Sequence, residues 1–161
     1  MTLDPLVIEF EVGVSPARAF DAWTQRCATW WPTLHTISGD PAAITFEPRS
    51  GGRIFERAAD GGEHEWGTVL DWQPPTRLRY RWHLFFDPGE ATEVEVTFTV
   101  RDGHTAVRLE QRGWDRLGEA GTVRRGGPSD EIYRRIEWAI HKSNNNRACK
   151  PRTRPRRYRQ A

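Results

Sequence analysis

Apolar and polar residues alternate along most of this chain, which is the pattern of β-strands with one buried face. In residues 6–12, every second residue from Leu6 to Val12 is apolar, and Val7, Glu9 and Glu11 stand between them. Six later runs are also predicted as strands, at residues 44–47, 52–57, 63–72, 77–85, 93–100 and 105–111, and the alternation is clearest in 77–85 and 93–100. Asp102-Gly103, between the last two runs, fits a type I′ hairpin turn. The pattern predicts seven strands, joined mainly as an antiparallel meander.

Two short helical segments are predicted after the first strand. Ser15 followed by Pro16 is a typical helix start, because serine caps the free amides and proline suits the first turn. The helix then covers 17–23, with its apolar stripe ending at Trp23. A second helical turn fits residues 24–31, before Pro32 ends it.

A C-terminal helix is predicted from Ser129, because two acidic residues follow in its first turn. Apolar residues then recur at helical spacing, at Ile132, Tyr133, Ile136, Ala139 and Ile140. We expect about three turns before a structureless basic end. A sheet with one apolar face needs a cover, which this helix supplies. The elements together predict the α+β class: a curved antiparallel sheet of about seven strands, two short N-terminal helices and a C-terminal helix.

The 161 residues are enough for one domain with a real core. No window approaches 18 consecutive apolar residues, and the N-terminus has neither a basic region nor a cleavage site. The two cysteines, Cys27 and Cys149, form neither a disulfide framework nor a zinc site by themselves. We therefore expect a cytoplasmic protein, with Cys27 as a buried small hydrophobe.

Charge is distributed unevenly along the chain. Residues 1–141 carry 16 arginines, no lysine and 22 acidic residues, whereas residues 142–161 carry eight basic residues and no acidic one. All lysines and asparagines also lie in this last stretch. We expect one domain over residues 5–141 and a basic tail over 142–161 that is disordered or not native to the protein. Its charge alone would suit nucleic acid or an anionic membrane, but a solvated tail explains the same composition, so we expect neither partner.

Catalytic signatures are missing from the sequence: it contains no GxSxG, HExxH, P-loop or GxGxxG motif. His64 and Glu65 beside His83 would make a metal or acid–base site if all faced inward. However, His83 alternates with arginines, which predicts that it faces water. We expect no catalytic residue, no metal and no cofactor.

The eight tryptophans are the strongest chemical feature. They either line a cavity for an apolar or aromatic molecule or simply fill the core; for Trp23 we favour the core. Each buried indole N–H needs an acceptor, for which Glu65, Thr68 or a backbone carbonyl are candidates. Arg53 and Arg79 either anchor a ligand carboxylate or belong to a solvated sheet face. The predicted ligand-binding residues are Trp30, Trp31, Phe46, Arg53, Phe55, Glu65, Trp66, Tyr80, Trp82 and Trp114.

Several segments resemble a known family in their order and spacing. They are the opening Val14–Thr24 stretch, Trp30-Trp31-Pro32, Gly51-Gly52-Arg53-Ile54, Trp66-Gly67-Thr68-Val69 and Gly113-Trp114-Asp115-Arg116-Leu117. Together they resemble the helix-grip fold of the START and plant-pollen-allergen (SRPBCC) superfamily. More narrowly, residues 5–125 resemble the bacterial single-domain homologues of the activator of heat-shock protein 90 ATPase. Members of this family normally end in a long amphipathic helix, whereas the composition here changes near Gly126.

The resemblance implies a module that binds a small hydrophobic or aromatic ligand, as a monomer or homodimer, and no established enzyme activity. Two alternatives remain open. One is a co-chaperone-like domain that binds another protein. The other is an enzyme resembling polyketide cyclases and dehydratases, which use acid–base residues in the same cavity. The family name alone does not decide among them.

Overall fold

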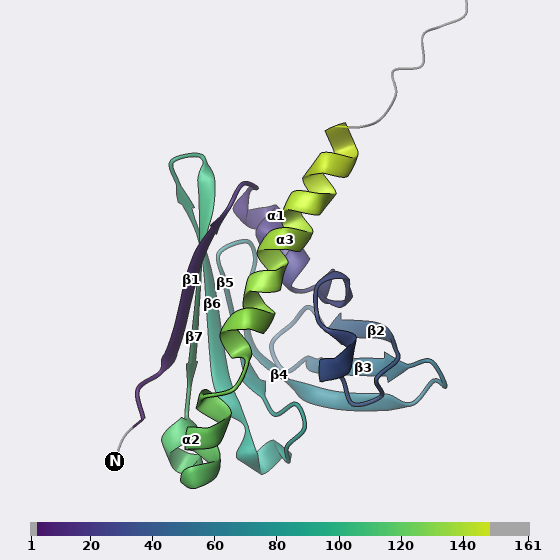
Figure 1. Cartoon of the computed structure of the whole chain (residues 1–161), viewed down its shortest axis with the longest axis vertical. Coiled ribbons are helices and arrows are strands. Elements are labelled where there is room, and N and C mark those ends of the chain that lie inside the picture. The colour runs from purple at the N-terminus through teal and green to yellow at the C-terminus, as the bar shows by residue number, and fades with distance from the viewer. Residues whose placement is uncertain (1–2, 149–161) are drawn as a thin grey trace, which may run out of the picture.

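A strongly curved sheet wraps around one long helix (Figure 1) in the computed structural model, which describes residues 3–148 and side chains up to residue 140. The strands are β1 (Leu6–Val12), β2 (Pro41–Phe46), β3 (Arg53–Ala58), β4 (Glu63–Gln73), β5 (Arg77–Trp82), β6 (Thr92–Arg101) and β7 (His104–Arg112). The helices are α1 (Pro16–Trp23), α2 (Glu119–Arg125) and α3 (Ser129–Ala148), with short 3₁₀ turns η1 (Cys27–Thr29), η2 (Thr33–His35), η3 (Pro88–Glu90) and η4 (Trp114–Leu117).

The sheet has the order β1-β7-β6-β5-β4-β3-β2, and every neighbouring pair is antiparallel. Asp102 and Gly103, with φ of 50° and 79°, form the β6–β7 turn that the sequence predicts. Gly67 lies beside an irregularity in the β3–β4 register, where a Cβ atom would collide with the Arg81 carbonyl. A residue without a side chain is therefore needed where the sheet bends. The predicted α+β class and seven-stranded antiparallel sheet are confirmed.

Helix α1 begins as predicted, with the Ser15 side chain accepting a 3.3 Å hydrogen bond from the Arg18 amide. The predicted second helix over 24–31 is wrong, because only the 3₁₀ turn η1 forms there. The indole N–H of Trp30 donates to the Ala22 carbonyl at 2.8 Å. This bond folds the chain back onto the end of α1, which favours a tight turn over a second helix.

Helix α3 is longer than the three turns predicted, since it continues to Ala148. No proline or glycine interrupts the chain between Pro128 and Pro151, so nothing in the backbone stops the helix at residue 140. Residues 142–148 of the predicted tail are thus helical, and the remainder, 149–161, lies outside the described residues. In Figure 1, α3 crosses the concave side of the sheet, as expected of the cover.

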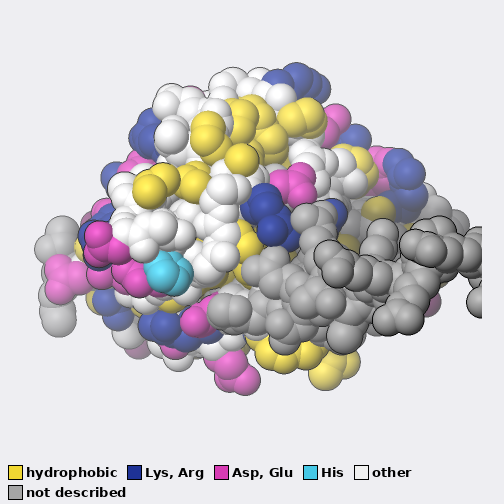
Figure 2. Space-filling view, turned by 90° about the horizontal axis from the view of Figure 1, so that it is seen from above, with side chains coloured by type: hydrophobic (Ala, Val, Ile, Leu, Met, Phe, Trp, Pro, Cys, Tyr) yellow, Lys and Arg dark blue, Asp and Glu magenta, His cyan; other side chains and the backbone are white. Residues whose placement is uncertain are grey.

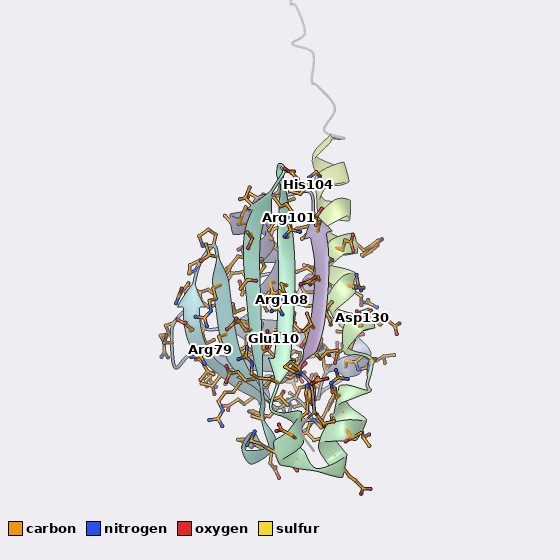
Figure 3. The ribbon with its side chains drawn as sticks, turned by 90° about the vertical axis from the view of Figure 1, so that its left-hand side faces the viewer. Arg79, Arg101, His104, Arg108, Glu110 and Asp130 are labelled. Carbon is orange, nitrogen blue, oxygen red and sulfur yellow. The ribbon has the colours of Figure 1, made fainter. Side chains whose placement is uncertain are left out.

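The convex face of the sheet carries rows of charged side chains (Figure 3). Arg77 donates to Glu95 at 2.8 Å and Arg79 to Glu93 at 3.0 Å, so opposite charges pair across the neighbouring strands β5 and β6. Farther along the sheet, Arg108 pairs with Glu110 at 2.8 Å. Because these charged residues lie on the convex face, the hydrophobic core forms on the opposite, concave face.

Hydrophobic residues on the concave face pack against α1 and α3. Figure 2 looks onto the upper end of the molecule, where hydrophobic side chains gather in one part of the face and charged ones flank them. A shallow depression between α1 and the Pro74-Pro75 turn lies near this end. Among the described residues, no helix has the length and apolar character needed to cross a membrane.

Candidate functional site

The upper part of the grip is filled by aromatic rings in direct contact. Trp23 stacks on Tyr133 of α3, with centroids 5.4 Å apart and planes inclined by 10°. Trp66 and Tyr80 each lie 5.6 Å from Trp82, and both are almost completely buried. Burial raises the pKa of the Tyr133 and Tyr80 phenols, so both hydroxyls stay protonated at neutral pH. These rings form a packed core, and two of them, Trp82 and Tyr133, also line the adjacent pocket.

Four of the buried indole N–H groups donate to acceptors within the protein. Trp30, Trp31 and Trp114 donate to the backbone carbonyls of Ala22, His35 and Gln111 at 2.8, 3.0 and 2.9 Å. These bonds confirm the predicted use of carbonyl acceptors. For Trp66 the acceptor is Glu56, at 3.0 Å. The candidates Glu65 and Thr68 are therefore wrong for this indole.

Glu56 is a fully buried carboxylate that fixes the segment after η2. It accepts hydrogen bonds from the Ile37 amide, from the Ser38 hydroxyl at 2.7 Å and from the Trp66 indole. Burial acts to raise the pKa of Glu56, but these hydrogen bonds outweigh it and hold that pKa below its ordinary value. The segment that carries His35 is thereby tied to β3.

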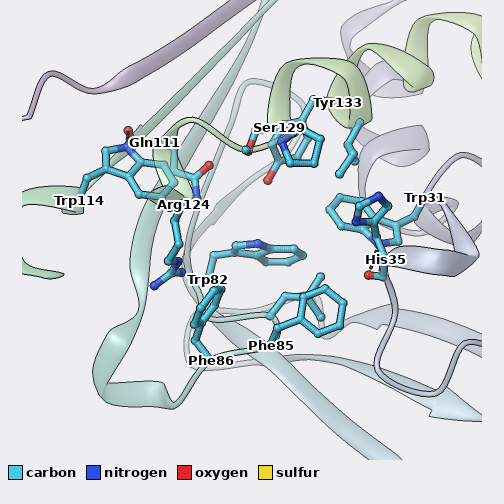
Figure 4. Close-up of a pocket in the computed structure, with 14 residues that line it drawn as sticks. Trp31, His35, Trp82, Phe85, Phe86, Gln111, Trp114, Arg124, Ser129 and Tyr133 are labelled. Carbon is cyan, nitrogen blue, oxygen red and sulfur yellow. Dashed lines mark hydrogen bonds between the residues drawn. The ribbon is translucent and has the colours of Figure 1, made fainter. Parts of the chain in front are cut away.

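A pocket opens below the packed rings, between the ends of β5 and β7, the start of α3 and the loop after β5 (Figure 4). We call it the grip pocket. Its volume is about 210 Å³. It is lined by Trp31, His35, Trp82, Leu84, Phe85, Phe86, Gln111, Trp114, Arg124, Gly127, Pro128, Ser129, Ile132 and Tyr133. Pockets for drug-sized ligands commonly measure about 300–1,000 Å³, so this one suits a molecule of one or two rings.

Two polar side chains of the grip pocket, Gln111 and Arg124, lie at one end, beside Trp114. Figure 4 shows Gln111 and Arg124 on this side, with Trp31 and His35 across the pocket and Trp82 between. Gln111 is buried on β7, where Val107 and Leu109 precede it on the same face. A predominantly apolar wall with a few placed polar groups is typical of small-molecule sites.

Arg124, on α2, supplies the pocket's cationic side chain. Its guanidinium lies 3.7 Å from the centre of the Phe86 ring and donates to the Glu90 carbonyl at 2.7 Å. Burial lowers the pKa of Arg124, and nearby Glu90 partly offsets this effect. Arginine nevertheless stays charged at neutral pH. No residue within the described part of the chain forms an ion pair with it.

The loop after β5 differs from the prediction. The strand ends at Trp82 rather than Phe85, and Phe85 adopts a φ of 69° with half of its surface exposed. His83 is buried, so the prediction that it faces water is wrong. Because the strand has already ended, alternation no longer sets the direction of this side chain. Its Nδ1 lies 3.2 Å from the Phe86 carbonyl and its Nε2 lies 3.5 Å from Glu65.

The predicted ligand-binding residues fall into three groups. Trp31, Trp82 and Trp114 line the grip pocket. Trp30, Phe46, Trp66 and Tyr80 belong to the packed core. The remaining three, Arg53, Phe55 and Glu65, lie away from the pocket.

Each residue of the third group has contacts of its own. Arg53 pairs with Glu63 at 3.1 Å and covers the Phe55 ring at 4.2 Å. Glu65 is half exposed beside His83, in an open surface depression. Arg79, the other candidate anchor, pairs with Glu93. Neither arginine reaches the grip pocket.

Sequence reasoning missed Gln111, Arg124, His35 and the Phe85-Phe86 pair. For Gln111 a signal existed, since it is a polar residue at an apolar position of an alternating run. Arg124 carries no such signal, because only the folded chain brings α2 against the loop after β5. Phe85 falls at the end of the predicted strand 77–85, whereas the strand ends at Trp82, and Phe86 lies beyond both.

Solved structures with the same fold include three that cover most of this chain. An anthrahydroquino-gamma-pyrone synthase, Txn09, complexed with SUM, is 28% identical, with a TM-score of 0.62 over 86% of this chain and 97% of its own. A Mesorhizobium loti protein is 23% identical, with a TM-score of 0.62 and coverage of 88% and 97%. A Rhodobacter sphaeroides protein is 18% identical, with a TM-score of 0.65 and coverage of 92% and 95%. The last two show the fold alone.

The comparison with curated proteins gave no match. A family model described as activator of Hsp90 ATPase homolog 1-like protein matches residues 13–137, which is most of the chain. This match includes α1, the whole sheet from β2 to β7, and the first part of α3. The resemblance read from the sequence is confirmed, and the chain belongs to the activator of Hsp90 ATPase homolog 1-like family, within the START/SRPBCC superfamily.

Proposed function

We propose that this chain binds a small aromatic or apolar molecule in the grip pocket. The observation that carries the proposal is the pocket's lining: three tryptophans and two phenylalanines surround a space that the core side chains leave open. An aromatic ligand buries apolar surface against such walls and makes edge or face contacts with their rings. The likeness to a synthase solved as a complex adds support, because that protein shares 28% of its residues and the whole fold.

Native mass spectrometry tests this proposal when it is combined with a variant that blocks the pocket. Ser129 lines the pocket at the first residue of α3, so Ser129→Phe places a ring in the space. Glu131→Phe adds the same ring at an exposed position of the same helix and serves as the control. We expect a small molecule to remain on the native wild type and on Glu131→Phe, and to be absent from Ser129→Phe. Equal retention by all three proteins would place the ligand elsewhere.

A second candidate is an enzyme of the cyclase or dehydratase type, favoured by the likeness to a synthase. Among the described residues that line the grip pocket, His35 carries the imidazole, the side chain that most often serves as a general acid or base. Incubating the co-purified molecule with wild type and with His35→Gln tests this candidate. Mass spectrometry shows a product with the wild type alone if the protein is an enzyme. An unchanged molecule in both samples argues for binding without catalysis.

A further inference from the structure

Gln111 presents a buried acceptor that has no partner among the described residues. The Gln111 amide nitrogen donates to the Thr92 hydroxyl at 2.8 Å, and that hydroxyl donates to the Trp82 carbonyl at 3.4 Å. This chain of bonds fixes the direction of the amide, since the only proton of the Thr92 hydroxyl is used for the carbonyl. Oε1 is thus the free end of the side chain. It is buried and accepts no hydrogen bond from the described residues, and Gln111 is one of the residues that line the grip pocket.

An unpaired buried acceptor destabilises the folded protein. We therefore expect a donor from another molecule to pair with it. The side chain of Gln111 is held in place at its other end, with Gln111 and Thr92 only 3% and 2% exposed. It is therefore a fixed receptor for an O–H or N–H group. A hydroxyl on an aromatic ring matches the pocket, because the ring contacts the tryptophans while its proton reaches Oε1.

Arg124 lies at the same end of the pocket and has no anionic partner among the described residues. Its positive charge is partly removed from water and is offset by one backbone carbonyl and an aromatic face. An anionic oxygen on the ligand satisfies it better than either, through a charge-assisted hydrogen bond. Figure 4 shows Arg124 on the Gln111 side of the Trp82 ring, with Trp114 beside both.

From these two groups we infer that the grip pocket selects a hydroxylated aromatic compound that also bears an anionic oxygen, such as a carboxylate. The inference rests on the proposed binding function and names the ligand class. The ring lies against Trp82 and Trp114, its hydroxyl donates to Oε1 of Gln111, and its anionic oxygen accepts from Arg124. The depression near α1 has no comparable unpaired polar group among its described residues.

Four naphthalene probes separate these interactions by isothermal titration calorimetry. They are 4-hydroxy-2-naphthoate, 4-methoxy-2-naphthoate, 2-naphthoate and 1-naphthol. The methoxy probe keeps the rings and the anion but replaces the donor proton with a methyl group, and 2-naphthoate lacks the donor without adding that volume. In contrast, 1-naphthol keeps the hydroxyl and removes the anion. We expect wild type to bind the hydroxy acid about tenfold more tightly than either the methoxy acid or 1-naphthol, since each loses one buried polar contact.

Substitutions at two positions, Gln111 and Arg124, assign each preference to its residue. Gln111→Leu weakens the hydroxy acid about tenfold and leaves the methoxy acid nearly unchanged. Gln111→Met, which conserves the side-chain length, gives the same pattern if the leucine variant folds poorly. Arg124→Met reduces the preference for acids over 1-naphthol, and Arg124→Lys restores part of it. Arg101→Gln removes a charge from an exposed side chain at the other end of the molecule and leaves the ranking unchanged.

The outcomes distinguish a failure of this inference from a failure of the proposed binding function. If wild type binds all four probes equally, or if Gln111→Leu affects the hydroxy and methoxy acids alike, the polar selection is wrong while binding in the pocket stands. If water alone satisfies Oε1, the wild type shows no preference for the hydroxyl, which also overturns the inference. If none of the four probes binds, the proposed binding of aromatic molecules fails with it.

Discussion

The two ends of the grip use the same residue types for different purposes. In the packed end, Trp23 and Trp66 touch other rings on several sides, and the Trp66 indole donates to a buried carboxylate. In the hollow end, Trp82 and Trp114 border an open space. There a buried amide oxygen accepts no hydrogen bond from the described residues, and a guanidinium is paired with a backbone carbonyl and a ring face rather than with a carboxylate.

The difference shows that the neighbours of an aromatic residue, rather than its type, decide whether it serves stability or binding. A ring that is surrounded by rings, with a satisfied N–H, contributes to stability. A ring beside an unpaired buried polar group lines a binding site, where a ligand supplies the missing hydrogen bond. Substitutions in the two ends should therefore separate stability from binding.

The largest effect on stability is expected in the packed end. Trp23→Ala removes a ring that is 1% exposed and stacked on Tyr133, which should lower the free energy of unfolding by about 4 kcal/mol. Urea unfolding followed by circular dichroism measures the loss. Leu34→Ala, at an 89% exposed position, is the control and should change it by less than about 0.5 kcal/mol. A loss below about 1 kcal/mol for Trp23→Ala would contradict the packed core.

Glu56→Gln should cost about 3 kcal/mol, because the amide cannot accept all the hydrogen bonds that the carboxylate accepts. The pKa of Glu56 is lower in the folded protein than its unfolded value of about 4.3. Its contribution is therefore fully present above that value and is lost as the pH falls through the folded pKa. Urea titrations between about pH 3 and pH 7 measure this dependence. If Glu56→Gln retains the wild-type slope at acidic pH, another carboxylate is responsible.

Gly121→Ala should cost about 2 kcal/mol and weaken probe binding as well. A Cβ atom at Gly121 would collide with the Trp114 carbonyl, so α2 must shift and carry Arg124 with it. Gly89→Ala, where a Cβ atom meets nothing within 4 Å, is the matched control. Calorimetric titration with 4-hydroxy-2-naphthoate and thermal unfolding follow the two effects. Unchanged affinity in a destabilised Gly121→Ala would show that the position of α2 does not govern binding.

The smallest effect is expected on the convex face. Arg79→Gln breaks the 3.0 Å pair with Glu93, whose side chains are both about one-third exposed, and should cost about 0.5 kcal/mol. The loss should shrink further as salt screens the pair. A double-mutant cycle with Glu93→Gln measures the pair directly. A coupling above about 2 kcal/mol would mean that this face contributes as much as the interior.

Much of the fold could be predicted because alternation sets which face each strand residue occupies. Leu78, Tyr80 and Trp82 all point to the concave side as their spacing requires. Prediction failed where a strand ended early, as at His83, since the same spacing no longer applied. It also failed for the length of α3, because helix ends depend on breakers that lie beyond the apolar pattern.

The candidate site was harder to predict because it is made of exceptions to the pattern. Glu56 and Gln111 stand at core-facing positions of β3 and β7, and a polar residue at such a position is the available sequence signal. Whether it ends up satisfied, like Glu56, or open, like the Gln111 oxygen, depends on residues far away in the chain. Only the folded arrangement distinguishes these two cases.

The indole N–H signals in a ¹H–¹⁵N NMR titration with 4-hydroxy-2-naphthoate test the contrast between the two ends most directly. Single Trp→Phe variants assign the signals. Binding in the grip pocket predicts that the signals of Trp31, Trp82 and Trp114 shift on saturation, while those of Trp23, Trp30 and Trp66 barely move. Shifts concentrated in the second set, or none in the first, would contradict the assignment of the hollow end as the binding site.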